Sequence, residues 1–378
     1  MRKLIIASII SALIVAMGFS VTLGRGRAAL DAPASYPGLT AGGQSATVTF
    51  GGAVRSYYLY VPTEIAAHPD IAVPLVIALH GGLGSGQQLA NTSQLNVEAD
   101  RLGFVVAYPD GLLLPTATGA YVQTWNGGGC CGPAMATGVD DVGFVASVIS
   151  SLEAATAINQ SKVIVGGHSN GAILAWRIAC DRADILTAAV IVEGSLERPS
   201  CAPSRGVALV QVHGDDDEFL PLEGGIGPKS FEQTVFTSAA ASQAMWTTAQ
   251  HCASPVPSTA DHLTITTWPA CAGGVASKLI VIAEGTHAWA GADPAKSAPF
   301  LGVPSPYFSA TGVFSDLVAA PAPASVNGIA EYSQLEPDEA AARHHSSTAN
   351  TLAFAALAAG GALLLAAGGW YARRHWLT

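Results

Sequence analysis

Short apolar runs alternate with segments of helical pattern through the middle of the chain. The apolar, β-branched runs predict seven strands, at residues 56–61, 74–79, 104–108, 162–165, 188–192, 207–212 and 278–282. The intervening segments predict helices at residues 88–102, 141–155, 171–182 and 231–249. Continuous apolar strands are typical of sheets buried on both faces, so the pattern predicts an α/β fold with a mostly parallel central sheet between helices.

Both ends of the chain are strongly apolar. Residues 1–34 begin with Met1-Arg2-Lys3 and an apolar run, which is the pattern of a secretory signal. The run is long for a cleaved signal peptide, so an uncleaved signal-anchor remains an alternative. Residues 351–369 carry no charge and are followed by two aromatic residues and two arginines, which predicts a transmembrane helix with a basic cytoplasmic tail over residues 351–378. The central part of the chain is therefore predicted to be exported and anchored in the cell membrane.

Composition divides the exported part in two. Residues 319–350 are rich in Ala, Pro, Ser and Glu, which is typical of a flexible stalk, so residues 35–318 form the predicted folded domain. The 378 residues carry a net charge of −10, which excludes a generally basic nucleic-acid binder. Only 12% of residues are charged and 50% are hydrophobic, which excludes a disordered chain.

The clearest motif is Gly167-His168-Ser169-Asn170-Gly171, which lies between a predicted strand and a predicted helix. This arrangement is a nucleophile elbow, in which small neighbours allow a strained turn to present the serine hydroxyl above the sheet. A serine hydroxyl needs a base to remove its proton, and the fold expects an acid and then a histidine further along the chain. His287 follows the last predicted strand and is the candidate base.

The acid is not fixed by chemistry alone. Asp215, Asp216, Asp217 and Glu218 follow one predicted strand, and each is a candidate partner for the imidazole. Such a cluster of hard oxygen ligands is also typical of a calcium site.

The loop after residues 74–79 predicts an oxyanion hole. It reads His80-Gly81-Gly82-Leu83-Gly84, and the expected donors are the backbone N–H groups of Gly82 and Asn170, with Leu83 as an alternative to Gly82. The glycine spacing fits neither G-x-G-x-x-G nor a loop followed by G-K-[ST], which excludes a phosphate-binding loop.

From about residue 46 to residue 317 the chain resembles the polyhydroxybutyrate-depolymerase and feruloyl-esterase group of secreted serine esterases, in the α/β-hydrolase superfamily. Besides the elbow and the loop at His80, the matching segments are Tyr108-Pro109-Asp110-Gly111, Thr124-Trp125-Asn126, Cys130-Cys131-Gly132, Val139-Asp140-Asp141-Val142-Gly143-Phe144, His213-Gly214-x-x-Asp217 and Gly285-x-His287-x-Trp289. The resemblance implies an α/β-hydrolase fold, with Asp217 as the acid and His287 as the base. Many members have Cys at the position of Gly82 and Pro at the position of Ala290, so the substrate stays open.

The sequence also predicts roles for two tryptophans, two aspartates and the six cysteines. Trp125 and Trp289 are candidates for lining the substrate pocket, although core packing fits them equally well. Asp140 and Asp141 begin a predicted helix and are expected to cap it.

Six cysteines indicate an oxidising compartment, and the absence of C-x-x-C disfavours a zinc site. Spacing and the resemblance together favour a Cys252–Cys271 disulfide, with Cys130 and Cys131 pairing with Cys180 and Cys201.

The sequence therefore predicts an exported, membrane-tethered serine esterase that needs no cofactor or metal. Ser169 would attack the ester, His287 would take the serine proton, and Asp217 would orient the imidazole. Expected substrates are polyhydroxyalkanoate oligomers or feruloyl and acetyl sugar esters. The alternatives are a catalytically silent hydrolase fold that binds at the cell surface, and an acyltransferase or peptidase on the same fold.

Overall fold

The computed structural model describes residues 37–231 and 233–321. The predicted signal segment (1–34), the transmembrane helix (351–378) and nearly all of the predicted stalk (319–350) lie outside the described residues. Within the described ranges, no helix has both the length and the apolar character that crossing a membrane requires.

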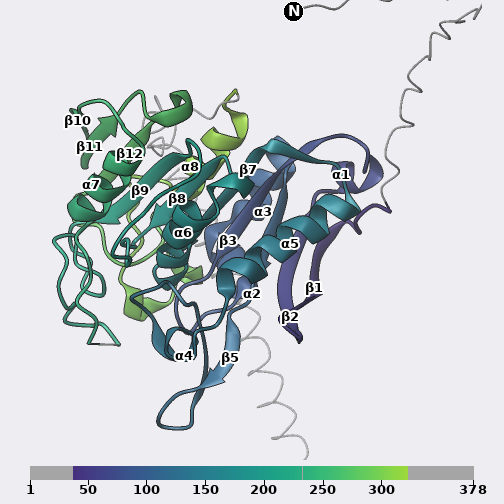
Figure 1. Cartoon of the computed structure of the whole chain (residues 1–378), viewed down its shortest axis with the longest axis horizontal. Helices are drawn as coiled ribbons and strands as arrows, with labels where there is room; N and C mark the ends of the chain where they lie inside the picture. Colours follow the sequence, from purple (N-terminus) through teal and green to yellow (C-terminus); the bar gives the residue numbers. More distant parts are fainter. Residues whose placement is uncertain (1–36, 232, 322–378) are drawn as a thin grey trace, which may run out of the picture. The chain divides into compact units, whose positions relative to one another are not determined.

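One ten-stranded sheet organises the described residues (Figure 1). The strands lie in the order β1-β2-β4-β3-β7-β8-β9-β12-β11-β10. The six strands from β4 to β12 in this order are parallel, and the two at each edge run antiparallel to their neighbours. Their bounds are β1 (Gly42–Phe50), β2 (Ala53–Val61), β3 (Val73–Leu79), β4 (Val105–Pro109), β7 (Ile158–His168), β8 (Ala188–Val192), β9 (Ala208–Gly214), β10 (Val256–Ala260), β11 (Leu263–Trp268) and β12 (Ser277–Ile282).

Helices cover both faces of this sheet. On one face α2 (Gly86–Ser93), α3 (Leu95–Leu102) and α8 (Ala310–Ala319) share an apolar core with the strands. On the other face α5 (Asp141–Ala155), α6 (Asn170–Asp181) and α7 (Ala239–Ala249) do the same. Both faces of the central strands are buried, as their continuous apolar sequences predict; every residue of β4, β8 and β9 is buried. The predicted α/β fold, with a mostly parallel sheet between helices, is confirmed.

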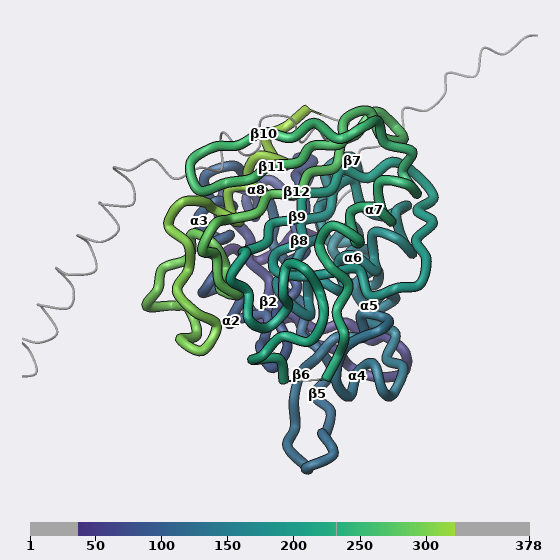
Figure 2. Tube along the Cα trace, turned by 90° about the vertical axis from the view of Figure 1, so that its left-hand side faces the viewer, coloured from purple at the N-terminus to yellow at the C-terminus, as the bar shows by residue number. Residues whose placement is uncertain are grey.

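Smaller elements complete the domain. The short helices α1 (Thr63–Ala67) and α4 (Gly132–Ala136) lie outside the main layers, and β5 (Leu112–Pro115) pairs with β6 (Tyr121–Thr124) as a separate hairpin. Figure 2 shows this hairpin projecting from the domain, with β10, β11, β12, β9 and β8 stacked side by side.

The sequence pattern and the structure differ in two helices. The segment 88–102 is broken at Gln94, whose left-handed backbone (φ 58°) separates α2 from α3. The segment 231–249 is helical only from Ala239, where the Ser238 side chain accepts a hydrogen bond from the amide of Ala241 and so caps the helix. Residues before that cap form a loop at the pocket described below. The edge strands β1, β10 and β11 and the β5–β6 hairpin were not predicted, because their sequences alternate or mix polar and apolar residues.

The two acidic residues at the start of α5 have different roles. Asp140 is the predicted N-cap, since its side chain accepts a hydrogen bond of 2.8 Å from the amide of Gly143. Asp141 is fully buried and is not the cap. It forms an ion pair of 3.0 Å with Arg55 and accepts a hydrogen bond from the amide of Asn126.

The disulfides correct one expectation. Cys252 is linked to Cys271, as the resemblance implies, but Cys180 is linked to Cys201 and Cys130 to its neighbour Cys131. The expected pairing of Cys130 and Cys131 with Cys180 and Cys201 is wrong because Cys130 and Cys131 lie near the start of α6, whereas Cys180 lies near its end. Cys180 is next to the last residue of this 12-residue helix, which is about 18 Å long. Cys131 lines the same pocket as Ser169, which is the N-cap residue of α6.

Candidate active site

Ser169 lies in the sharp turn between β7 and α6, with φ 55° and ψ −124°. A positive φ is uncommon for a residue other than glycine and is found mostly where the surrounding structure enforces it. The two flanking glycines explain how the turn closes. A Cβ at Gly171 would lie 2.3 Å from the carbonyl oxygen of Leu79, and one at Gly167 would lie 2.6 Å from the carbonyl carbon of Gly171. Only residues without a side chain allow the turn to approach β3 this closely.

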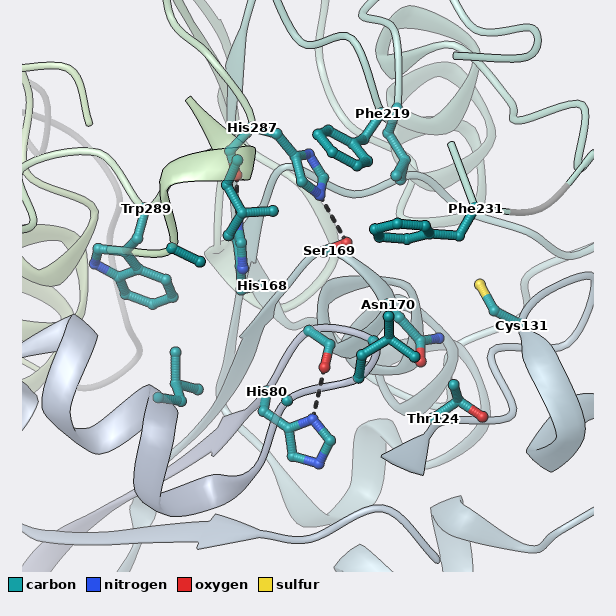
Figure 3. A pocket seen from close by; sticks show the side chains of 18 of the residues that line it. His80, Thr124, Cys131, His168, Ser169, Asn170, Phe219, Phe231, His287 and Trp289 are labelled. Carbon is teal, nitrogen blue, oxygen red and sulfur yellow. Dashed lines mark hydrogen bonds between the residues drawn. The ribbon is translucent and has the colours of Figure 1, made fainter. Parts of the chain in front are cut away.

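A continuous hydrogen-bond chain runs from Ser169 through His287 to Asp217. Ser169 Oγ lies 2.8 Å from His287 Nε2, and His287 Nδ1 lies 2.7 Å from Asp217 Oδ2 (Figure 3 shows the first of these bonds). Since a carboxylate accepts, Nδ1 carries the proton, which leaves Nε2 free to accept from the serine hydroxyl. The structure thus brings together three residues that are far apart in the sequence.

Of the four acidic residues at 215–218, only Asp217 faces the imidazole. Its other oxygen accepts hydrogen bonds from the amides of Phe219 (2.8 Å) and Leu220 (2.9 Å). Burial by itself opposes ionisation of Asp217, but the charge and hydrogen bond of His287 outweigh it and hold the pKa of this carboxyl below its usual range.

The neighbouring carboxylates point elsewhere and do not converge on a common point, which removes the arrangement that a calcium site would need. Asp215 accepts a hydrogen bond from the amide of Glu284, and Glu218 pairs with Lys229. Asp216 is exposed to solvent.

Two backbone N–H groups are available beside Ser169. The amide of Asn170 is the first of α6, where helices have no acceptor of their own for the N–H, and the amide of Gly82 lies in the loop after β3. Among the described residues, neither amide donates a hydrogen bond to another backbone group. The alternative donor, Leu83, is already engaged, since its amide donates to the carbonyl oxygen of Gln123 at 2.9 Å. The Asn170 and Gly82 pair is therefore the arrangement that can receive an oxyanion.

Trp125 does not line the pocket, which corrects the expectation for this residue. Its ring is fully buried beside His80, and its indole N–H donates to the carbonyl oxygen of His80 at 2.8 Å. The backbone of Trp125 is held by Asn170, whose side-chain oxygen accepts from its N–H and whose amide group donates to its carbonyl. Trp125 thus supports the loop that carries Gly82. Trp289 does line the pocket, with its indole N–H bonded to Thr311.

The pocket above Ser169 has a volume of about 400 Å³ and is lined mostly by apolar side chains. Figure 3 shows Phe219 and Phe231 on the side of His287 and Trp289 on the opposite side. None of the described lining residues is Asp, Glu, Lys or Arg. The apolar lining was not predicted from the sequence. It is contributed by separate loops and helices through Phe219, Phe231, Phe236, Phe300, Leu301 and Ile173. No local pattern marks these residues, because each one looks like an ordinary apolar position.

His80 gives the fold a predictable sensitivity to acid. Its Nδ1–H donates to the carbonyl oxygen of Gly81 and its Nε2 accepts from the amide of Gly111, so the buried ring is neutral. Burial lowers the pKa of His80 from 6.5 to about 4, with Gly81 and Asp110 opposing this only in part. The unfolded chain therefore binds a proton that the folded chain does not, and stability present above about pH 6.5 is lost as the pH falls toward 4.

We expect the free energy of unfolding to drop by about 2 kcal/mol between pH 7 and pH 5 through this residue alone. Urea unfolding followed by circular dichroism at the two pH values measures the drop. His80→Gln keeps an acceptor for Gly111 but does not titrate, so its pH dependence should be smaller by that amount. An identical pH dependence in the variant and the wild type would contradict the expectation.

Part of the chain is similar in sequence to known esterases. Residues 55–199 match the model of the family described as Esterase PHB depolymerase. The chain is 27% identical over 179 residues to a putative esterase, NocK, of Nocardia uniformis subsp. tsuyamanensis, covering 47% of this chain and 49% of that protein. It is 27% identical over 173 residues to a probable feruloyl esterase C of Aspergillus clavatus, covering 46% of this chain and 58% of that protein. The chain thus spans about half the length of these curated relatives. Among solved structures, an acetyl xylan esterase from Aspergillus awamori is similar, with a TM-score of 0.47 and 16% identity over 64% of this chain and 94% of that chain.

Proposed function

We propose that the protein is a carboxylic ester hydrolase with Ser169 as its nucleophile, in line with the match of residues 55–199 to the family described as Esterase PHB depolymerase. The observation that carries the proposal is the hydrogen-bond chain from Ser169 to His287 to Asp217, which begins in an apolar pocket. Beside it lie the amides of Asn170 and Gly82, which have no backbone partner among the described residues. This is the constellation that acyl transfer from an ester to water requires.

The proposed reaction has two halves. Ser169 Oγ attacks the ester carbonyl carbon while its proton passes to His287 Nε2, and the negative oxygen of the tetrahedral intermediate is held by the Asn170 and Gly82 amides. Asp217 stabilises the imidazolium, which then gives its proton to the leaving alcohol. In the second half a water molecule, deprotonated by His287, attacks the acyl-serine and releases the acid. No step calls for a cofactor.

The substrate is proposed to have an apolar acyl group, because the pocket is lined mostly by aromatic and aliphatic side chains without a charged residue among its described lining. Polyhydroxyalkanoate oligomers and feruloyl or acetyl sugar esters are the candidates. The names of the relatives support the sugar esters: a probable feruloyl esterase from Aspergillus clavatus and an acetylxylan esterase from Talaromyces purpureogenus, which is 29% identical over 140 residues.

A substrate panel tests the proposal. The purified protein is offered short p-nitrophenyl esters, feruloyl and acetyl sugars, hydroxyalkanoate oligomers, peptides and acyl acceptors, and the products are identified by mass spectrometry. Hydrolysis of at least one ester class is expected. Turnover of peptides alone, or acyl transfer to an acceptor in preference to water, would replace the proposal with the peptidase or the acyltransferase. A folded protein that turns over nothing would favour a silent hydrolase fold that binds at the cell surface.

We also propose that the enzyme domain is exported and tethered to the cell membrane by residues 351–369. Three disulfides within the described residues support export, because such bonds persist in oxidising compartments. The length and charge pattern of the C-terminal segment support the tether.

The tether makes a testable prediction. The full-length protein should sediment with membranes, and a chain ending at Ala320, just after α8, should be released in active form. Fractionation and ester hydrolysis in each fraction measure this. Protease added to intact cells should digest the domain and spare a tag placed after Thr378. Full-length protein found in the soluble fraction, or a mature protein that mass spectrometry shows to lack the C-terminal segment, would contradict the tether.

A further inference from the structure

A second buried carboxyl group lies behind Asp217 and has no part in the reaction described above. Glu193 directly follows β8 and is 1% exposed. Both of its carboxyl oxygens lie within hydrogen-bond distance of the amide of Gly214, at 3.0 and 3.1 Å. A carboxyl oxygen of Glu193, a ring nitrogen of His213 and a carboxyl oxygen of Asp217 all lie within 4.8 Å of one another. The carboxyl group of Asp217, the acid of the proposed triad, therefore lies next to a second buried carboxyl group, that of Glu193.

The charges around this pair do not balance if both carboxyls are ionised. The titratable groups that face Glu193 are Asp217 and His213, and His287 lies beyond Asp217. His213 Nε2 is 3.6 Å from the nearest oxygen of each carboxyl, but it donates its proton to the carbonyl oxygen of Leu220 at 2.8 Å. Burial lowers the pKa of His213, so this ring is neutral. Two adjacent buried negative charges without a compensating cation are costly, so one carboxyl carries a proton.

The hydrogen bonds indicate which one. Asp217 receives three donors, which are the amides of Phe219 and Leu220 and the Nδ1–H of His287. Within the part of the chain that the structure describes, Glu193 receives a single donor, the amide of Gly214. Donors stabilise the ionised form, so the negative charge belongs on Asp217 and the proton on Glu193. Burial and then the charge of Asp217 raise the pKa of Glu193 well above its usual range, in agreement with this assignment.

We propose that Glu193 is an un-ionised carboxylic acid that donates its hydrogen bond to Asp217 and thereby positions the acid of the triad. The proposal rests on the proposed ester hydrolysis for its catalytic meaning. Glu193 touches neither substrate nor reacting atoms, so it is a positioning residue. Because Glu193 carries a proton, the Glu193 and Asp217 carboxyl groups together hold a single negative charge. The hydrogen bond from Glu193 keeps the Asp217 carboxylate in the orientation that His287 Nδ1 needs.

The protonation is tested without any activity. The infrared difference spectrum between the full-length wild type and Glu193→Gln at pH 7 should contain the carbonyl stretch of an un-ionised carboxylic acid. Glu197→Gln is the matched control, because Glu197 is also buried but accepts hydrogen bonds from Ser195 and Thr237, away from the triad. The carboxylic acid band should persist in the spectrum of Glu197→Gln, so it should be absent from the difference spectrum between the wild type and this control. A difference spectrum for Glu193→Gln that shows only the loss of an ionised carboxylate would overturn the proposal.

The positioning is tested by kinetics on an ester that the wild type hydrolyses. Glu193→Ala removes the donor and should lower kcat by about 10- to 100-fold with little change in KM. Glu193→Gln restores a neutral donor and should bring kcat back to within about threefold of the wild type, with the acid limb of kcat/KM unmoved.

If Glu193 is instead ionised, Glu193→Gln removes a negative charge near His287, and the acid limb shifts to lower pH by about one unit. That shift, or equal losses in the two variants, would overturn the proposal. Failure of the wild type to hydrolyse any ester would count against the proposed function, and the infrared band would still decide the state of Glu193.

Discussion

Replacing Ser169 by alanine is expected to lower kcat/KM for a short p-nitrophenyl ester by about 10⁴- to 10⁶-fold while the protein remains folded. The loss is large because the hydroxyl is the proposed nucleophile, and the two backbone amides and the pocket alone supply only a small part of the acceleration. The fold should survive, since the Ser169 hydroxyl bonds only to His287 among the described residues. Single-turnover and steady-state assays with circular dichroism of the same sample measure both properties.

Ser297 offers a matched control for this variant. It lines the same pocket, and its buried hydroxyl has no hydrogen-bond partner among the described residues. Ser297→Ala should therefore cost less than about tenfold in kcat/KM, since no hydrogen bond is lost. If Ser169→Ala retained about a tenth or more of the wild-type activity, Ser169 would not be the nucleophile.

The second large effect is expected for Asp217→Asn, which should lower kcat by about 10⁴-fold. Asparagine keeps the size of the side chain and can still accept from the Phe219 and Leu220 amides. It carries no charge to stabilise the imidazolium of His287, and its amide group favours the wrong tautomer of the ring. The measurement is kcat across the pH range, with thermal unfolding to show that the variant is folded.

Asp216→Asn is the control, because this carboxylate is exposed on the same loop one residue away. Its kcat should stay within about threefold of the wild type, as for other exposed positions outside the reacting groups. The reverse result, with Asp216→Asn inactive and Asp217→Asn active, would show that the acid has been assigned to the wrong carboxylate.

Local features of the sequence were enough to predict much of the fold. Short apolar runs predicted the seven strands that form the centre of the sheet. The prediction is most direct for β3, β4 and β8, because strands buried on both faces have continuous apolar sequences. The bounds of α5 were predicted as 141–155, because its start is marked by a capping side chain, Asp140. The elbow at Ser169 was visible because its glycines are sterically required, as the contacts of Gly167 and Gly171 with neighbouring backbone show.

Other features depend on contacts between residues far apart in the chain, and local sequence patterns did not determine them. For the acid, only the family resemblance pointed to Asp217. Four consecutive carboxylates are chemically equivalent as partners for a histidine, and only the packing of the loop after β9 turns Asp217 inward to His287, 70 residues away in sequence. Two of the cysteine pairs also depend on the tertiary structure, because Cys180 lies near the end of α6, away from Cys130 and Cys131 near its start. The environment of Glu193, a neutral imidazole on one side and a charged carboxylate on the other, arises where the loops after β8, β9 and β12 meet. Charge, burial and hydrogen bonding at such a point are properties of the assembled sheet, because each loop supplies only one of the interacting groups.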